Sequence, residues 1–433
     1  MRHVLITTCL TICSVAAITS AIAEELPVIN APVIDASEVR QPLDAPRAPD
    51  AALSLSYGGY TGMQYRSNIY RETSNETDDF IAVVAPAFTL RSDLDRHAIT
   101  VKGMIEAGHF LLESDNDYVD ADLRANSRYD VTNDSFIDLH GQWRYDHVDV
   151  GGFSTDLSDL TRRSEEPTPY NYGEAGILYE TPLNDMLIAR AGVTGLYFNY
   201  SNVNTLGGTP IIQDDRDRYE VIGTGLLAYQ AQPNLLPFVA VDVNIRRYDK
   251  RVDATALYER DSSGVGVFVG SEYNDEKEDD VWAAGRIGFL HQDYDNDFLP
   301  DVNTLGLDGE AGYRFNETTR VVAKVARAVM ENTFFGGSSA VQTTADTVLY
   351  HDIAPAWVID GKLRYTINDF QINPTGGRKK REDTIYENVI GATYTIANPL
   401  YLRAQYGYAN RTSDEARAEY NDNSVMFLVG MTY

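Results

Sequence analysis

The sequence has almost no cysteine, and this absence excludes several kinds of chemistry. Its only two cysteines, Cys9 and Cys13, lie near the start of a 433-residue chain. Residues 1–23 have a basic start, then an apolar run, and close with the small-x-small sequence AIA. This pattern is typical of a secretory signal peptide, here cleaved after Ala23. We therefore expect an exported, cysteine-free mature protein without disulfides, thiol catalysis or cysteine-bound metal.

Long hydrophobic runs and positive charge are also scarce. No stretch after residue 23 has the roughly 20 apolar residues that a membrane helix needs. Lys and Arg total 36 against 64 Asp and Glu, so the net charge is −28. This acidity argues against a nucleic-acid partner. A mean hydropathy of −0.30 fits a soluble protein. It also fits a membrane β-barrel, in which only every second residue faces lipid.

Residues 24–56 differ in composition from the rest of the chain. They are rich in Pro and Ala, with prolines at positions 27, 32, 42, 46 and 49, and contain almost no aromatic residues. Such a segment cannot pack a core, so we interpret it as an extended periplasmic linker. A partner-binding tail or a plug is the alternative interpretation.

From residue 57 onward, apolar and polar residues alternate. In 358–368, Ile359, Leu363 and Tyr365 take one face and polar or charged residues take the other. Soluble sandwiches alternate too, but these strands run to about 12–16 residues where soluble strands average about 5–6. Short turns also alternate with long polar loops along the chain. Both features predict an all-β fold, a single antiparallel up-and-down transmembrane barrel over 57–433 with short periplasmic turns and longer extracellular loops.

We expect about 18 strands, with 16 as the alternative. The stretches 262–273 and 345–353 show the weakest alternation. The predicted strands lie near 57–70, 78–91, 96–111, 118–131, 135–149, 170–181, 186–200, 217–230, 235–249, 262–273, 280–294, 303–315, 319–333, 345–353, 358–370, 383–396, 400–412 and 421–433.

The last strand carries a specific terminal pattern. Apolar residues recur at every second position back from Tyr433, including Phe427. This strand resembles the C-terminal signal by which barrel-assembly machinery recognises its clients, so we predict Phe427 and Tyr433 as an assembly signal. The 28 tyrosines fit aromatic girdles at the two membrane surfaces. Together with the signal peptide, these features predict the outer membrane of a Gram-negative bacterium.

The final third of the chain carries a family resemblance. The segment "REDTIYENVIGATYTIANPLYLRAQYGYANRTS" is a strand, an Asn-Pro turn and a return strand. With the secretory signal, the Pro/Ala-rich lead and the long alternating strands, it resembles the outer-membrane β-barrel porin family associated with exopolysaccharide gene clusters. The resemblance implies outer-membrane location and a part in polysaccharide export, with no catalytic residues. The partners it implies are outer-membrane lipid and lipopolysaccharide, barrel-assembly machinery, a polysaccharide and periplasmic export proteins.

Alternation predicts a charged lumen. Inward positions carry acids and bases in similar number although the chain is strongly acidic. A basic wall would guide export of an acidic exopolysaccharide by weak sequential contacts. The alternatives are that these charges neutralise one another, and that the barrel is a general diffusion porin. The predicted lumen-lining bases are Lys102, Arg124, Arg128, Arg144, Arg246, Arg314, Lys362, Arg364 and Arg403.

We predict no cofactor, and only a weak candidate for a metal site. The stretch 293–301 places Asp293, Asp295, Asp297 and Asp301 in calcium-like spacing, but it has Phe298 where the mid-loop Gly belongs. A plain acidic outer loop is the simpler interpretation. A barrel enzyme is a further alternative, because several histidines lie toward the predicted outer rim. No G-x-S-x-G or H-E-x-x-H motif supports it.

Overall fold

The computed structural model describes residues 53–94, 96–150, 164–205, 207–249, 260–274, 281–331, 337–372 and 380–433. The predicted signal peptide and nearly all of the predicted linker therefore lie outside the described residues. Three-residue 3-10 turns are the helical elements of the described chain, and none of them has the length or hydropathy of a membrane-crossing helix.

The chain is built almost entirely from long antiparallel strands. In the first half these are β1 (Leu53–Arg66), β2 (Asp79–Leu94), β3 (His97–Phe110), β4 (Tyr118–Asp130), β5 (Phe136–Val148), β6 (Thr168–Asn184), β7 (Leu187–Tyr200), the short β8 (Val203–Asn204) and β9 (Pro210–Ile211), and β10 (Arg218–Tyr229). The second half holds β11 (Leu235–Tyr248), β12 (Ser262–Asn274), β13 (Val281–Tyr294), β14 (Val302–Asn316), β15 (Thr319–Glu331), β16 (Gly337–Ala354), β17 (Trp357–Ile372), β18 (Glu382–Ala397), β19 (Leu400–Ser413) and β20 (Tyr420–Thr432). The 3-10 turns are η1 (Ser114–Asn116), η3 (Asp214–Arg216) and η5 (Ala416–Ala418).

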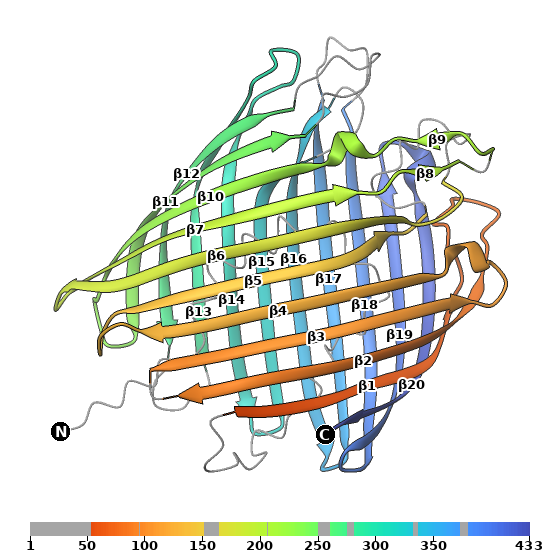
Figure 1. Ribbon diagram of the computed structural model, residues 1–433, viewed down its shortest axis with the longest axis horizontal. Helices are drawn as coiled ribbons and strands as arrows, with labels where there is room; N and C mark the ends of the chain where they lie inside the picture. Colours follow the sequence, from red (N-terminus) through yellow and green to blue (C-terminus); the bar gives the residue numbers. More distant parts are fainter. Residues whose placement is uncertain are drawn as a thin grey trace.

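Eighteen of these strands form one closed sheet. Each long strand pairs with its neighbours in sequence, and β7 pairs directly with β10 because β8 and β9 form a separate hairpin between them. The sheet closes where β1 pairs with β20, and Tyr57 and Tyr433 exchange backbone hydrogen bonds of 2.9 and 2.8 Å. Figure 1 shows β1–β7 in front, crossing β13–β19 at a steep angle behind, as the tilt of barrel strands requires. The predicted 18-stranded barrel is confirmed.

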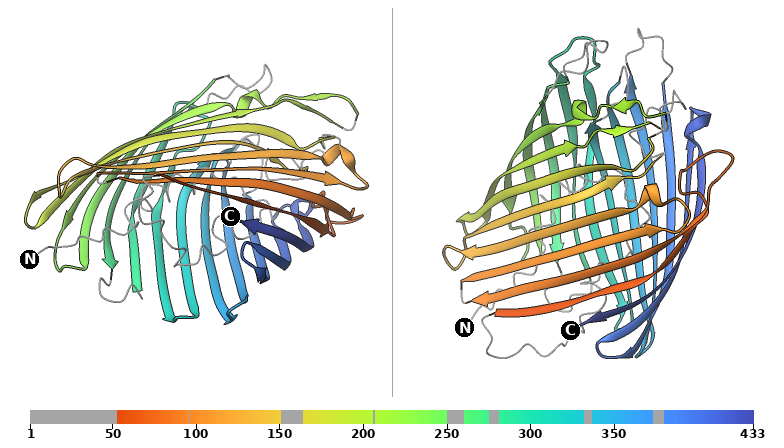
Figure 2. Two further views of the ribbon diagram at one scale, coloured as in Figure 1. Left: turned by 60° about the horizontal axis from the view of Figure 1, so that its bottom comes forward. Right: turned by 45° about the vertical axis from the view of Figure 1, so that its right-hand side comes forward.

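The two ends of the barrel differ in the length of their connections. One end, the short-turn end, carries tight links such as 185–186, 317–318, 355–356 and 398–399. The other, the long-loop end, carries extended connections, including the one with β8 and β9, which lies at the upper right of Figure 1 and is drawn in light green in both views of Figure 2. In outer-membrane barrels short turns are periplasmic and long loops extracellular.

Alternation sorts side chains onto two chemically different walls. On β11, Val239, Val241 and Val243 are about half exposed, whereas Ala240 and Asp242 between them are buried. An exposed apolar face on a closed sheet is the surface that contacts lipid. Outward aromatic residues gather near the short-turn end, as a membrane-surface girdle does: Tyr57, Tyr129, Tyr179, Tyr229, Tyr313, Trp357 and Tyr433.

Some predicted boundaries were wrong. The barrel begins at Leu53, inside the predicted linker 24–56, because Leu53 and Leu55 continue the outward apolar alternation while β1 pairs with β2. The first strand ends at Arg66 rather than at the predicted residue 70. The chain turns after Arg66, because the Asn68 side chain forms hydrogen bonds with both the backbone carbonyl and the backbone N–H of Glu72. The strand predicted at 345–353 spans Gly337–Ala354, because β17 extends far enough to pair with its polar start.

Candidate functional site

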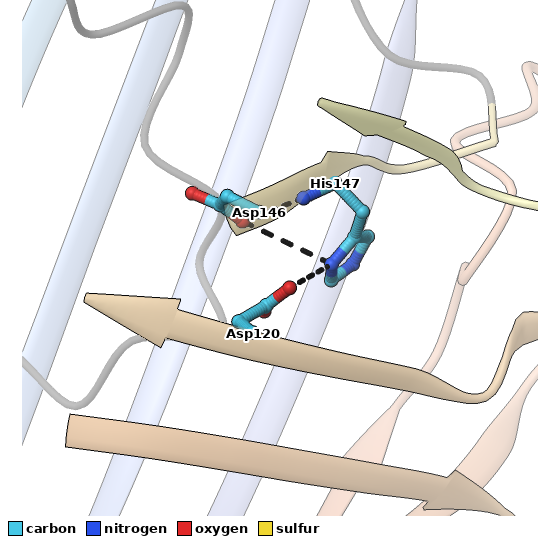
Figure 3. Close-up of side chains that lie close together, drawn as sticks. All are labelled: Asp120, Asp146 and His147. Atoms are coloured by element: carbon cyan, nitrogen blue, oxygen red, sulfur yellow. Dashed lines mark hydrogen bonds and ion pairs between the residues drawn. The ribbon is translucent and has the colours of Figure 1, made fainter. Parts of the chain in front are cut away.

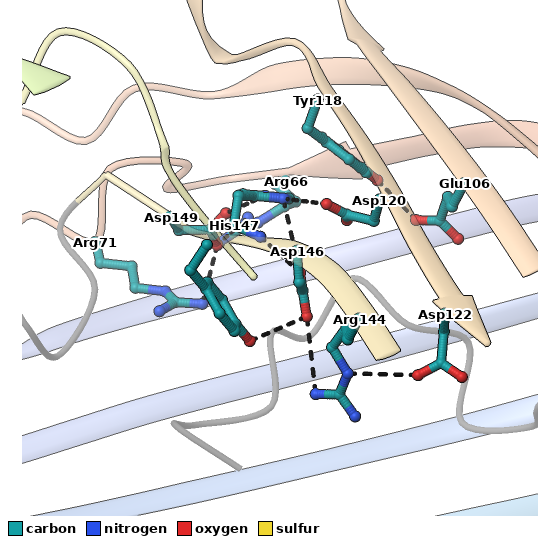
Figure 4. Close-up of polar contacts among 11 residues, drawn as sticks. Arg66, Arg71, Glu106, Tyr118, Asp120, Asp122, Arg144, Asp146, His147 and Asp149 are labelled. Carbon is teal, nitrogen blue, oxygen red and sulfur yellow. Dashed lines mark hydrogen bonds and ion pairs between the residues drawn. The ribbon is translucent and has the colours of Figure 1, made fainter. Parts of the chain in front are cut away.

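The inner wall of the barrel is polar, and most of its cations are paired with carboxylates. Arg246, Arg364 and Arg403 are nearly fully buried. Arg403 bonds both oxygens of Asp360, at 2.6 and 2.9 Å. Figure 4 shows part of this wall, where Arg144 lies between two acidic side chains. Other ion pairs of the predicted lumen bases are Arg364–Asp346, Arg246–Glu220, Arg144–Asp122, Arg144–Asp146, Arg124–Asp122 and Arg128–Asp130.

The other three predicted lumen bases are placed by strand register. Lys102 lies opposite Arg124 on the neighbouring strand, and Arg314 lies opposite Arg320. Lys362 lies between Asp360 and Arg364 on the same face of β17. These bases lie beside other cationic or acidic side chains, so positive and negative charges are closely interspersed on the inner wall.

Two ion pairs reach across two or more intervening strands. Arg246 of β11 bonds Glu331 of β15 although three strands lie between them, and Tyr248 and Tyr294 donate hydrogen bonds to the same carboxylate. Arg190 of β7 bonds Glu272 of β12 across two intervening strands. Contacts of this kind pass through the inside of the barrel. Alternation along β7 could have identified Arg190, but no sequence pattern indicates its partner.

A third connection, which we call the seam network, involves Arg66, Arg71, Asp149, Asp422 and His147. Figure 4 shows all of these residues except Asp422. Arg66 lies in the closing strand pair, contacting Asp422 of β20 at 2.8 Å and Asp149, just past β5, at 3.2 Å. Arg71 contacts the same Asp149 oxygen at 3.2 Å. Burial alone would raise the pKa of the Asp149 carboxyl, but Arg66, His147 and Arg71 hold that pKa well below its usual range. The network therefore ties the end of β5 to the seam of the barrel.

The imidazole of His147 joins the seam network to two further carboxylates. Its Nε2 lies 3.2 Å from Asp149 Oδ1, and its Nδ1 lies 2.9 Å from Asp120 Oδ1 and 3.9 Å from Asp146 Oδ1. Figure 3 shows Asp146 and His147 on one strand, facing Asp120 on the next. The β4–β5 ladder ends at Ala121 and Tyr145, so these side chains meet where the two strands separate. Alternation alone did not single out this cluster.

The predicted calcium-like loop is not assembled into a site. Asp301 accepts the backbone N–H of Tyr294, and Asp295 lies 3.9 Å from Arg247. Within the described ranges, the group of three acidic or imidazole ligands that comes together is Asp120, Asp146 and His147 instead. The four aspartates of 293–301 therefore do not come together as a ligand group in the described chain.

His140, which has a hydroxyl nearby, does not form a hydrolytic triad with it. His140 Nε2 lies 3.2 Å from Glu174 and 3.5 Å from the Thr194 hydroxyl. A triad needs its acid and its nucleophile on opposite ring nitrogens, whereas His140 presents the same nitrogen to both. At the C-terminus, Phe427 and Tyr433 point outward and are more than half exposed. Their role as an assembly signal stays a prediction.

Several solved structures are similar to this chain along most of its length. OccAB3 of Acinetobacter baumannii has a TM-score of 0.43 and 11% identity over 89% of this chain and 100% of that one. The outer membrane protein OpdK of Pseudomonas aeruginosa has a TM-score of 0.41 and 10% identity, covering 88% and 99%. The ferric enterobactin receptor PfeA of Pseudomonas aeruginosa, a mutant form, has a TM-score of 0.43 and 8% identity, covering 89% and 81%. No curated protein matches this chain.

The family assignment rests on the sequence itself. The family described as "Putative beta-barrel porin 2" matches residues 60–433, which is the whole barrel except the first half of β1. That range agrees with the closed 18-stranded sheet, its apolar outer wall and its charged inner wall. The chain therefore belongs to this β-barrel porin family, and its place is the outer membrane of a Gram-negative bacterium.

Proposed function

We propose that this protein is a passive channel for a hydrophilic solute. The observation that carries the proposal is the contrast between the two walls of the closed sheet, apolar outside and charged inside. A barrel of this many strands is too wide for its own side chains to fill, so a polar inner wall fits a water-filled path. The polar path lets a solute enter without losing its hydration.

The finer proposal is that the solute is an acidic exopolysaccharide. Two cations support it, Arg124 in the middle of β4 and Lys324 in the middle of β15. Eight strands separate β4 from β15 in either direction around the barrel, so the two side chains are on opposite walls (β4 in front and β15 behind in Figure 1). Their side chains are 50% and 54% exposed, which leaves them accessible to a passing anion despite their neighbours Asp122 and Glu310. Periplasmic export proteins would then meet the short-turn end, and lipopolysaccharide the outer wall.

A general diffusion porin is the second candidate. The close pairing of most inner-wall cations with carboxylates favours it, because paired charges do not form a continuous track of one sign. Such a channel would select solutes by size rather than by charge.

Planar-bilayer recordings separate these proposals. We expect the wild-type channel to conduct, to prefer anions in a salt gradient, and to be blocked transiently by acidic oligosaccharides. The double variant Arg124→Gln/Lys324→Gln should lower the anion preference, because it removes the exposed cations from both walls. The matched control Lys380→Gln removes a cation of 70% exposure outside the strands and should change nothing. Unchanged selectivity in the double variant would favour the diffusion porin, and no conductance at all would contradict the channel.

A further inference from the structure

We propose that Asp120, Asp146 and His147 form a binding site for a divalent first-row transition metal ion such as Zn²⁺. One ligand atom from each residue lies within 4.8 Å of the other two. Ligands about 2.0–2.2 Å from a zinc ion stand roughly 3–3.5 Å apart. The distances from His147 Nδ1 to Asp120 Oδ1 and Asp146 Oδ1, 2.9 and 3.9 Å, lie close to that spacing.

The surroundings of His147 favour a metal ligand. Metal-binding histidines almost always use their second ring nitrogen to donate to a carboxylate, which sets the tautomer and the ring orientation. Here Nε2 faces Asp149 Oδ1 at 3.2 Å, and Asp149 is held in turn by Arg66 and Arg71. This arrangement leaves Nδ1 directed at the two ligand carboxylates, as Figure 3 shows.

The chemistry of the three ligands selects the class of ion. Calcium and magnesium prefer oxygen ligands alone, whereas an imidazole with carboxylates suits zinc and its neighbours. A cavity of about 750 Å³ is lined by Asp120, Asp146, His147 and Tyr118. It provides an entry path and room for water at the remaining coordination positions.

The position of the site indicates what the ion does. Asp120 belongs to β4, while Asp146 and His147 belong to β5. The backbone ladder between these strands ends at Ala121 and Tyr145, one residue before the site. A bound ion would join the two strands where their hydrogen bonds stop, and would stiffen the end of β5 that reaches the seam network.

Zinc binding to the full chain, folded in detergent, tests the proposal. We expect equilibrium dialysis with zinc ion alone to give one tightly bound ion per chain, and zinc to raise the temperature of unfolding. His147→Gln and Asp120→Asn should each weaken zinc affinity at least about tenfold. His109→Gln is the matched control, because His109 also contacts an aspartate, Asp117, at 2.6 Å, but on an exposed surface.

Folding of each variant is checked by its heat-dependent gel mobility. If His147→Gln does not fold, Asp146→Asn carries the test, because it leaves the contacts of His147 with Asp120 and Asp149 in place. The proposal is overturned if the wild type binds no zinc ion. It is equally overturned if binding persists in the folded Asp146→Asn and Asp120→Asn variants, or disappears in His109→Gln.

Discussion

At the scale of single residues, the ion pairs of the inner wall differ in how deeply their side chains are buried. Asp360 and Arg403 are almost fully buried, and Arg403 also contacts Thr393 and Gln405. Arg124, in contrast, pairs with Asp122 while half of its side chain remains in water. A buried charge that loses its partner keeps its desolvation cost, whereas an exposed one is rehydrated.

We therefore predict that Arg403→Gln destabilises the folded barrel by about 3–5 kcal/mol, because it leaves Asp360 buried and uncompensated. Arg124→Gln, the control, should cost about 0–1 kcal/mol. Denaturant titration in detergent micelles, followed by heat-dependent gel mobility, measures both. Replacing both partners, as Asp360→Leu/Arg403→Met, should recover much of the loss. Equal stabilities for the two single arginine variants would contradict this account.

At the scale of elements, closure of the barrel requires the backbones of β1 and β20 to lie close together. A Cβ added at Gly62 of β1 would lie 2.2 Å from the carbonyl oxygen of Phe427 and 2.8 Å from the Cα of Leu428. Backbone atoms cannot move aside as a flexible side chain can. Glycine at this position is therefore a condition for pairing the first strand with the last.

Gly62→Ala should reduce the yield of closed barrel and lower its stability by about 1–3 kcal/mol, the usual cost of overpacking. Gly225 of β10 offers a matched control, because a Cβ there meets nothing within 4 Å. The folded fraction after refolding into detergent, read from gel mobility, compares the two variants. Wild-type yield and stability for Gly62→Ala would show that the seam can relax.

At the scale of the whole molecule, orientation follows from the unequal ends. Thr209 lies in the long connection between β7 and β10, in the turn that joins β8 to β9, whereas Asn133 and Asn398 lie in tight turns at the opposite end. Because the predicted mature chain has no cysteine of its own, single cysteines can report which end faces outward.

A cysteine at Thr209 should react with a membrane-impermeant maleimide added to intact cells, because long loops of outer-membrane barrels are extracellular. Cysteines at Asn133 or Asn398 should react only after the cells are permeabilised. The labelled fraction on gels gives the result. Labelling of Asn133 and Asn398 from outside, with Thr209 protected, would reverse the orientation.

The sequence by itself determined the class, the number of strands and the two walls of this barrel. Alternation and connection length are local properties, and each long strand from β2 onward pairs with the long strand before it. Alternation also assigns a residue such as Arg246 to the inner face, but it says nothing of which inward residue lies opposite.

Only the tertiary structure decided which inward residues meet. The contacts of Arg246 with Glu331 and of Arg66 with Asp149 depend on the curvature of the closed sheet. Asp120, Asp146 and His147, in contrast, meet where the neighbouring strands β4 and β5 separate. Adjacent strands lie about 4.8 Å apart, so three intervening strands put such partners well beyond side-chain reach on a flat sheet. Closing the sheet brings these partners into contact, and the shear of the barrel sets which residues lie at the same level along its axis.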